Sequence, residues 1–117
     1  MKAKKLIFVL AIAFVLASAF AACAAKLPKL KMLSTETCPA CMQMSKVLKK
    51  IDSDYANRLA TEYIDVNKHS DVARHYEVRY VPTLIFIDAN GKEFAMKVGY
   101  LSLDEVLEVF KKAGVKI

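Results

Sequence analysis

The sequence contains few of the residue types that build metal and nucleic-acid sites. Its 117 residues include only three cysteines and two histidines, and no second cysteine pair stands at a spacing suited to zinc. Aromatic residues make up 9% of the chain, and its arginines, Arg58, Arg74 and Arg79, are spread along the chain rather than clustered. We therefore expect neither a zinc site nor a nucleic-acid-binding surface.

The chain has room for one domain, and its first 25 residues do not fit that domain. Three lysines precede an apolar run from Leu6 to Phe20 that only Ser18 interrupts, and small residues follow it. This pattern is typical of a secretory signal, so we divide the chain into a signal peptide, residues 1–25, and a domain, residues 26–117. Without the signal the formal charge falls by three, from +6 to +3. Lysines on the leading side alone predict an exported domain, in the periplasm or on the outer face of the membrane.

The end of this signal leaves three alternative fates for Cys23. The segment Ala21-Ala22-Cys23 resembles the last positions of a bacterial lipoprotein signal, which predicts lipidation of Cys23 and membrane association through the N-terminus. Cleavage without lipid would leave Cys23 as an odd thiol if it followed Ala21, and would remove Cys23 if it followed Ala24 or Ala25. An uncleaved segment from Leu6 to Ala25 is long enough to span about 30 Å of hydrocarbon and would act as an anchor.

Two other cysteines, Cys38 and Cys41, stand three positions apart where a helical pattern begins. The next apolar residues recur at spacings of three, four and three, which is typical of an amphipathic helix: they are Met44, Val47, Leu48 and Ile51. Pro39 suits the first turn of that helix, where a missing N–H costs nothing. Cys41 then lies one turn beyond Cys38 on the same face, close enough to form a disulfide. A purely structural disulfide is disfavoured because so small a loop constrains the unfolded chain little.

The remaining pattern alternates strands and helices before it ends in a hairpin. Asn90-Gly91 predicts the hairpin turn, and Ser102 with Glu105 forms a capping box for the last helix. The sequence predicts, in order, strand 30–33, helix 39–51, strand 61–66, helix 71–76, strand 83–87, strand 93–98 and a helix from 103 to about 112. This order predicts an α/β fold with a central mixed four-stranded sheet and helices on both of its faces.

Several of these features together resemble the thioredoxin family, over about residues 29–115. They are the order of the elements, the motif Cys38-Pro39-Ala40-Cys41, Val81-Pro82-Thr83 at the entry to the central strand, Asn90-Gly91, and Gly99 before the last helix. The short spacing between Cys41 and Pro82 is that of compact thioredoxins and argues against relatives with a helical insertion. The resemblance implies a thioredoxin fold and no cofactor beyond a redox-active disulfide.

The cysteine pair is expected to carry the chemistry. A cysteine at a helix N-terminus gains thiolate character from unpaired N–H groups and the helix dipole, so Cys38 is the expected nucleophile and Cys41 the resolving thiol. The resemblance implies that Pro82 is cis and faces the cysteines. It also implies that the backbone of Val81 pairs with the substrate, and that Thr37 lies at the same substrate-binding surface.

The chain departs from soluble thioredoxins around this site. Thr37 replaces a tryptophan, and Pro-Ala replaces Gly-Pro between the cysteines. Met32 stands where the family buries an aspartate, and Tyr63 where that aspartate's lysine partner is expected. The usual proton acceptor for Cys41 is therefore absent. Glu36 and Glu62 are the acids that could replace it, although a role as solvated surface acids is favoured for both.

From these features we expect an extracytoplasmic thiol–disulfide oxidoreductase that reduces disulfides in exported proteins. Reduction outside the cytoplasm requires an electron donor, for which a membrane thiol transporter is the expected partner. Two alternatives remain open: a disulfide oxidase or isomerase, and a copper-binding chaperone that uses the cysteine pair with Met42 and Met44. Packing is the favoured role for both methionines.

Overall fold

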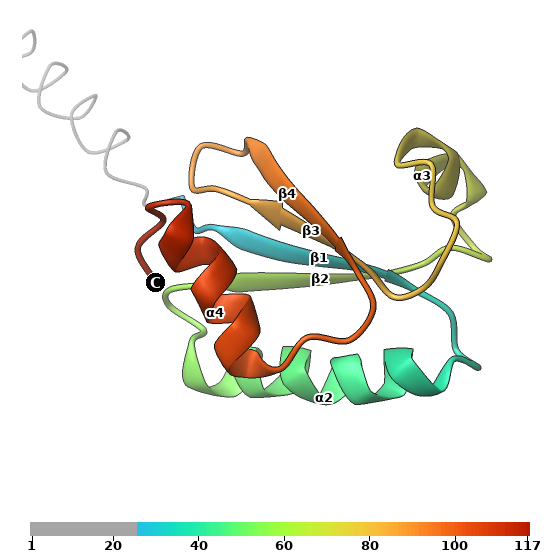
Figure 1. The fold of residues 1–117 in the computed structure, drawn as a ribbon, viewed down its shortest axis with the longest axis horizontal. Coiled ribbons are helices and arrows are strands. Elements are labelled where there is room, and N and C mark those ends of the chain that lie inside the picture. Colours follow the sequence, from blue (N-terminus) through green and yellow to red (C-terminus); the bar gives the residue numbers. More distant parts are fainter. Residues whose placement is uncertain (1–25) are drawn as a thin grey trace, which may run out of the picture.

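The computed structural model describes residues 26–117, so the expected signal peptide and Cys23 lie outside the described residues. Figure 1 shows a sheet with helices packed around it. The elements of this part of the chain are β1 (Lys29–Ser34), α2 (Pro39–Asp54), β2 (Ala60–Asp65), α3 (Ser70–His75), β3 (Thr83–Ile87), β4 (Glu93–Val98) and α4 (Leu103–Lys112). Their order and type are those that the sequence predicts.

The four strands form one mixed sheet in the order β2-β1-β3-β4. β1 runs parallel to β2 and antiparallel to β3, and β3 runs antiparallel to β4. The central strand β3 is buried from Thr83 to Phe86, whereas the edge strand β4 is exposed or half-buried throughout. The predicted α/β fold with a central mixed four-stranded sheet is confirmed.

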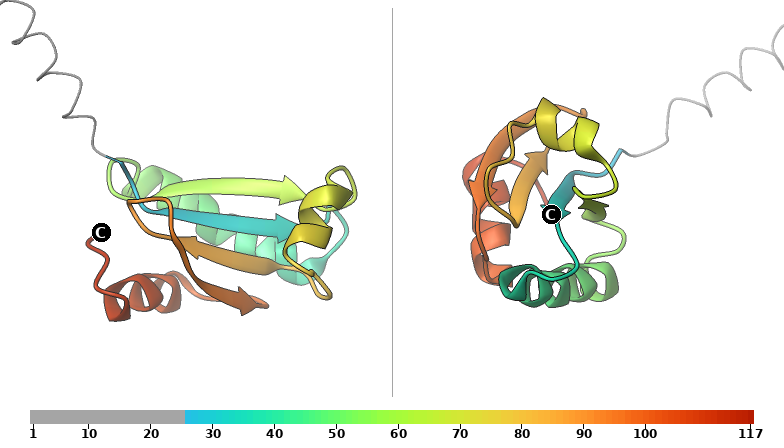
Figure 2. Two further views of the ribbon diagram at one scale, coloured as in Figure 1. Left: turned by 90° about the horizontal axis from the view of Figure 1, so that it is seen from above. Right: turned by 90° about the vertical axis from the view of Figure 1, so that its right-hand side faces the viewer.

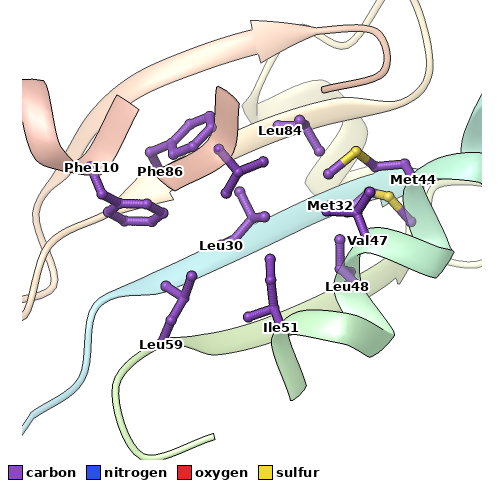
Figure 3. Packing of buried hydrophobic residues seen from close by; sticks show 11 residues of the cluster. Leu30, Met32, Met44, Val47, Leu48, Ile51, Leu59, Leu84, Phe86 and Phe110 are labelled. Carbon is purple, nitrogen blue, oxygen red and sulfur yellow. The ribbon is translucent and has the colours of Figure 1, made fainter. Parts of the chain in front are cut away.

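One face of the sheet carries the main hydrophobic core. Because side chains alternate along a strand, Leu30 and Met32 of β1 point to the same face, where α2 and α4 cover them. Figure 3 shows these side chains beside those of α2, including Met44 and Ile51. The ring of Phe110 on α4 lies 5.2 Å from that of Phe86 on β3, which joins the last helix to the centre of the sheet.

Helices lie on both sides of the sheet, as predicted. α2 lies below the sheet in Figure 1, and α3 lies on the opposite side, at the end where β1 and β2 finish. The right-hand view of Figure 2 shows the sheet between these two helices. Within residues 26–117, no helix combines the length and the apolar character that crossing a membrane requires.

Local signals explain where the longer helices begin and end. The predicted stripe of α2, from Met44 to Ile51, is buried. At the start of α4, the Ser102 side chain accepts the backbone N–H of Glu105, and the Glu105 side chain accepts the N–H of Ser102, so the predicted capping box is present. Gly114, with φ at +77°, follows the end of α4 in a conformation that favours glycine.

Candidate active site

The two cysteines lie at the end of the sheet where β1 finishes and α2 begins. Cys38 is the N-cap of α2, with an extended backbone, and Pro39 opens the helix after it. The Cys38 carbonyl accepts the first helical hydrogen bond from Met42 N at 3.1 Å. The Cys38 Sγ accepts the backbone N–H of Cys41 at 3.2 Å. A sulfur atom thus takes the place that a serine or aspartate oxygen takes at ordinary helix starts.

The two thiols have opposite electrostatic environments. Cys38 is partly exposed, and its pKa is lowered, chiefly by the side-chain hydrogen bond with Cys41 and also by the backbone amides of Cys41 and Ala40. Cys41 is 1% exposed, and burial is the main reason that its pKa is raised. Both thiols are free. The outer thiol is therefore the one that ionises first.

The entry to β3 lies directly against Cys38. The Val81–Pro82 peptide bond is cis, and Pro82 is fully buried. The Val81 carbonyl oxygen lies 3.8 Å from the Cys38 Sγ. Three segments, the end of β1, the start of α2 and the start of β3, therefore meet at the expected site, while Thr37 lies exposed in the loop before Cys38.

An exposed apolar rim lies on segments next to these residues, and sequence reasoning did not identify Tyr80, Val98 or Tyr100 as part of it. Gly99 N donates to Pro82 O at 2.8 Å, which holds the end of β4 beside the cis bond. Large apolar side chains near this point in the chain are exposed: Met42, Tyr80, Val98 and Tyr100. Tyr80, at 72% exposed, directly precedes Val81. The signal in the sequence is that apolar residues immediately flank both motifs.

The structure places the two candidate acids away from the Cys41 thiol. Glu36 is exposed and pairs with Lys68 at 3.0 Å. Glu62 pairs with Lys29 at 3.4 Å, on the sheet face opposite to the one that Met32 occupies. The favoured role of both residues as surface acids fits these positions.

A serine takes part in the site instead. Ser34, at the end of β1, is completely buried, and its hydroxyl and the Thr35 backbone both act to lower the pKa of Cys41, against the effect of burial. Its Oγ lies 3.3 Å from the Tyr63 hydroxyl oxygen on β2. Sequence reasoning missed Ser34, although alternation along β1 places it on the same face as Met32.

The described residues offer little for a metal ion. Among residues 26–117, no three His, Cys, Asp or Glu side chains are grouped so that they could hold one. Met44 is completely buried in the core, whereas Met42 is 59% exposed, so the two methionines face different environments. Both histidines, His69 and His75, are exposed.

Comparisons with known proteins give the same fold and family. Residues 19–114 match the protein family described as Thioredoxin-like domain. The chain is 34% identical to a thioredoxin of Acidithiobacillus ferridurans over 67 residues, which are 57% of this chain and 61% of that protein. It is 28% identical to a thioredoxin of Borreliella burgdorferi over 74 residues, which are 63% of this chain and 62% of that protein. The match thus spans less than two thirds of either relative.

A solved structure shows the same arrangement of the backbone. The chain is similar to the structure titled "Structural insights into thioredoxin-2: a component of malaria parasite protein secretion machinery", with a TM-score of 0.68 and 24% identity. That likeness covers 74% of this chain and 82% of the other. With its cysteine pair at the start of α2 and a family match over most of its length, the chain belongs to the thioredoxin-like domain family.

Proposed function

We propose that this protein is an extracytoplasmic thiol–disulfide oxidoreductase in which Cys38 attacks and Cys41 resolves. The observation that carries the proposal is the position of the Cys38 sulfur at the N-cap of α2. There it accepts the Cys41 N–H at 3.2 Å, has a lowered pKa and remains partly exposed. An accessible thiolate beside a second, buried thiol is the arrangement that disulfide exchange requires.

The exchange proceeds in two steps. The Cys38 thiolate attacks one sulfur of a substrate disulfide, so that a Cys38–substrate bond forms and the other substrate sulfur leaves as a thiolate, which takes up a proton. Cys41 then loses its proton and attacks the Cys38 sulfur. The Cys38–Cys41 disulfide forms, the second substrate thiolate leaves, and the substrate has gained two electrons.

The entry to β3 is suited to hold the substrate chain. The Val81 carbonyl oxygen lies 3.8 Å from the Cys38 Sγ, so an extended peptide that paired with Val81 would bring its own sulfur to Cys38. Pro82 and the exposed Thr37 border the same place, and the apolar rim at Tyr80 and Met42 offers contact area for substrate side chains. We assign substrate binding to Thr37, Val81 and Pro82.

We further propose that the protein works outside the cytoplasm, bound to the membrane through its N-terminus, and that it reduces exported proteins. The support is the signal-like pattern of residues 1–25, which ends at Cys23 in a lipoprotein-like motif. A membrane thiol transporter is the donor that would restore the dithiol, because no glutathione-based system maintains thiols there.

Trapping of mixed disulfides tests the exchange. A Cys41→Ser variant, expressed with its own signal, should accumulate disulfide-linked complexes through Cys38 that disappear on reduction. The matched control, Cys38→Ser, keeps Cys41 but should form none, since the Cys41 sulfur is buried. Mass spectrometry of the complexes would identify substrate and donor. Equal trapping by both variants, or none by Cys41→Ser, would reject the proposed roles.

The direction of electron flow has a separate test. Equilibration of the Cys38–Cys41 pair in glutathione buffers measures its reduction potential. A reductase should have a potential below about −200 mV, whereas a value well above that would identify an oxidase or isomerase. Protease accessibility in intact spheroplasts tests export, because an exported domain is digested while a cytoplasmic control protein is protected.

A further inference from the structure

One end of the molecule collects basic side chains from separate segments of the chain. Two adjoining hollows at this end share the lining residues Arg58 and Lys116. Lys26 lines one of these hollows, and Lys111 lines the other. We call these four residues the basic end. All four are exposed, although they come from the segment before β1, the turn after α2, the last turn of α4 and the segment that follows α4.

The basic end accounts for the net charge of the described chain. Asp88 is the one acidic side chain among the residues that line the two hollows, so the basic end has an excess of three positive charges. Residues 26–117 carry a formal charge of +3, so the other basic and acidic side chains of this part of the chain are equal in number. The positive potential of the domain is therefore concentrated at this end.

The basic end keeps its charges free of ion pairs within residues 26–117. The lysines that do pair with carboxylates in this part of the chain are Lys29, Lys31, Lys68 and Lys112. Arg58 is held by uncharged groups instead: its Nη2 donates to the Asp54 carbonyl at 3.3 Å, and its guanidinium carbon lies 4.5 Å from the centre of the Tyr55 ring. Its other N–H donors are available to phosphate oxygens, because Arg58 is exposed.

The basic end is also where residues 1–25 join the domain. Lys26 is the first described residue, and Leu27 beside it is 37% exposed. Figure 1 shows the start of β1 and the C-terminal segment at one end of the sheet, and the start of α2 at the other. The 16 residues of α2, about 24 Å of helix, separate Cys38 from the turn that holds Arg58. The cysteine pair and the basic end therefore lie at opposite ends of the domain.

We propose that the basic end docks on anionic phospholipid headgroups of the membrane to which the N-terminus is attached. Phosphate groups complement the unpaired ammonium and guanidinium groups, and the exposed Leu27 suits the boundary between headgroups and hydrocarbon. Attachment through Lys26 keeps this end close to the lipid, which raises the local concentration of the two surfaces. Docking directs Cys38 away from the bilayer. The inference rests on the proposed membrane attachment and not on the exchange chemistry.

A single tryptophan reports the contact, because the chain contains none of its own. Asn57→Trp places the reporter at an exposed position that lines the same hollow as Lys26. Gln43→Trp places it at an exposed position in the second turn of α2, near Cys38. The full-length chain is reconstituted in phosphatidylcholine vesicles in which a fraction of the headgroups carries a nitroxide quencher, with or without phosphatidylglycerol. Quenching then measures contact of each reporter with the headgroups.

The two reporters should respond differently to anionic lipid. At low ionic strength, phosphatidylglycerol should increase the quenching of Asn57→Trp by at least about twofold and should leave Gln43→Trp unchanged. Salt at about 1 M should remove the increase, because the Debye length then falls to about 3 Å. Equal quenching of Asn57→Trp with and without phosphatidylglycerol, or an equal increase for both reporters, would overturn the docking.

Neutral substitutions test the basic side chains themselves. The combined variant Arg58→Gln, Lys111→Gln and Lys116→Gln should abolish the effect of phosphatidylglycerol on Asn57→Trp. The matched control removes the same charge from exposed positions of α2, with Lys46→Gln, Lys49→Gln and Lys50→Gln, and should retain most of the effect. Cooperative thermal unfolding in detergent checks that both variants are folded. Loss of the effect in both would show that net charge alone causes it, and would overturn the assignment to this end.

Flotation of the vesicles on a density gradient separates failure of the docking from failure of the attachment. If the unsubstituted chain does not float with phosphatidylcholine vesicles, the proposed N-terminal attachment fails, and the docking with it. If the chain floats but Asn57→Trp does not respond to phosphatidylglycerol, the attachment stands and the docking is overturned. A shift in Asn57→Trp emission with soluble polyglutamate, without a response to phosphatidylglycerol, would overturn the lipid in favour of an acidic protein partner.

Discussion

The two cysteines are the same chemical group in two different environments. Cys38 lies at the helix start, and its pKa is lowered chiefly by the side-chain hydrogen bond with Cys41 and further by the backbone amides of Cys41 and Ala40. Cys41, one turn further on, faces the core, and burial raises its pKa. In the proposed exchange, this difference would give attack to Cys38 and resolution to Cys41, because the thiolate is the nucleophilic form of a cysteine.

A pair of substitutions at Cys41 tests the cause of the lowered pKa of Cys38. The largest contribution is the side-chain hydrogen bond with Cys41, so Cys41→Ala should raise the pKa of Cys38 toward its ordinary value of 9.0. Alkylation by iodoacetamide should then slow several-fold at neutral pH, since less thiolate is present. Cys41→Ser keeps a donor and should change the rate less. The measurement is the alkylation rate against pH, and coincident profiles for the two variants would show that the backbone amides alone set the pKa.

The start of α4 is the clearest place to test a helix cap. Ser102 satisfies the backbone N–H of Glu105, so Ser102→Ala should lower the free energy of unfolding by about 1 kcal/mol in denaturant titrations. Ser53→Ala is the control, because the Ser53 hydroxyl is exposed and bonds within the last turn of α2. Its effect should stay within about 0.5 kcal/mol. Equal effects of the two substitutions would contradict a specific role for the cap.

The same cap predicts a dependence of stability on pH. Hydrogen bonds from the Ser102 backbone and side chain lower the pKa of Glu105 below its ordinary value of 4.5. A lowered folded-state pKa adds stability that is fully present above pH 4.5 and is lost as the pH falls through the lowered pKa. Glu105→Gln should therefore lose stability at neutral pH but little at the acid end. Thermal unfolding at several pH values measures this, and a pH-independent difference from the unsubstituted protein would contradict it.

Phe110 of α4 makes two aromatic contacts with the sheet. Phe110 is completely buried, with its ring 5.2 Å from Phe86 and 5.6 Å from Phe94. Phe110→Ala removes this volume from the core and should cost about 3–5 kcal/mol of the free energy of unfolding. Lys111→Ala, at the exposed next position, is the control and should change the free energy by less than about 0.5 kcal/mol. A loss of less than about 1 kcal/mol in Phe110→Ala would show that these two ring contacts do not fix α4 to the sheet.

At the scale of the whole molecule, residues 26–117 hold a core of their own. Among the described residues, the main hydrophobic cluster extends from Leu30 to Phe110 and draws on β1, α2, β3 and α4, with Leu59 between α2 and β2. We therefore expect a chain that starts at Lys26 to fold alone, with coincident urea transitions by circular dichroism and tyrosine fluorescence. The alkylation rate of Cys38 should equal that of the full chain. Separate transitions, or a changed rate, would show that the preceding residues contribute to the fold or the site.

Much of the secondary structure can be predicted from the sequence because the signals that start and end the helices are local. Two local signals define α2: the apolar spacing from Met44 to Ile51 and the proline after Cys38. The capping box of Ser102 and Glu105 defines the start of α4. Each signal acts within a few residues, so it does not depend on the rest of the fold. The order of the elements then predicts the mixed sheet, since few ways of connecting them are sterically sound. The place of Cys38 at the helix start was determined in the same way.

Only the tertiary structure decided which distant groups meet the cysteines. Val81 reaches Cys38 across 43 positions because β3 enters the sheet beside the end of β1. The β1–β2 register brings Tyr63 to Ser34 and turns Glu62 to the other face, and a shift of one residue would exchange these roles. Sequence patterns specify which face a side chain takes within its own strand. The partner that it finds there depends on register, which forms only when the strands pair.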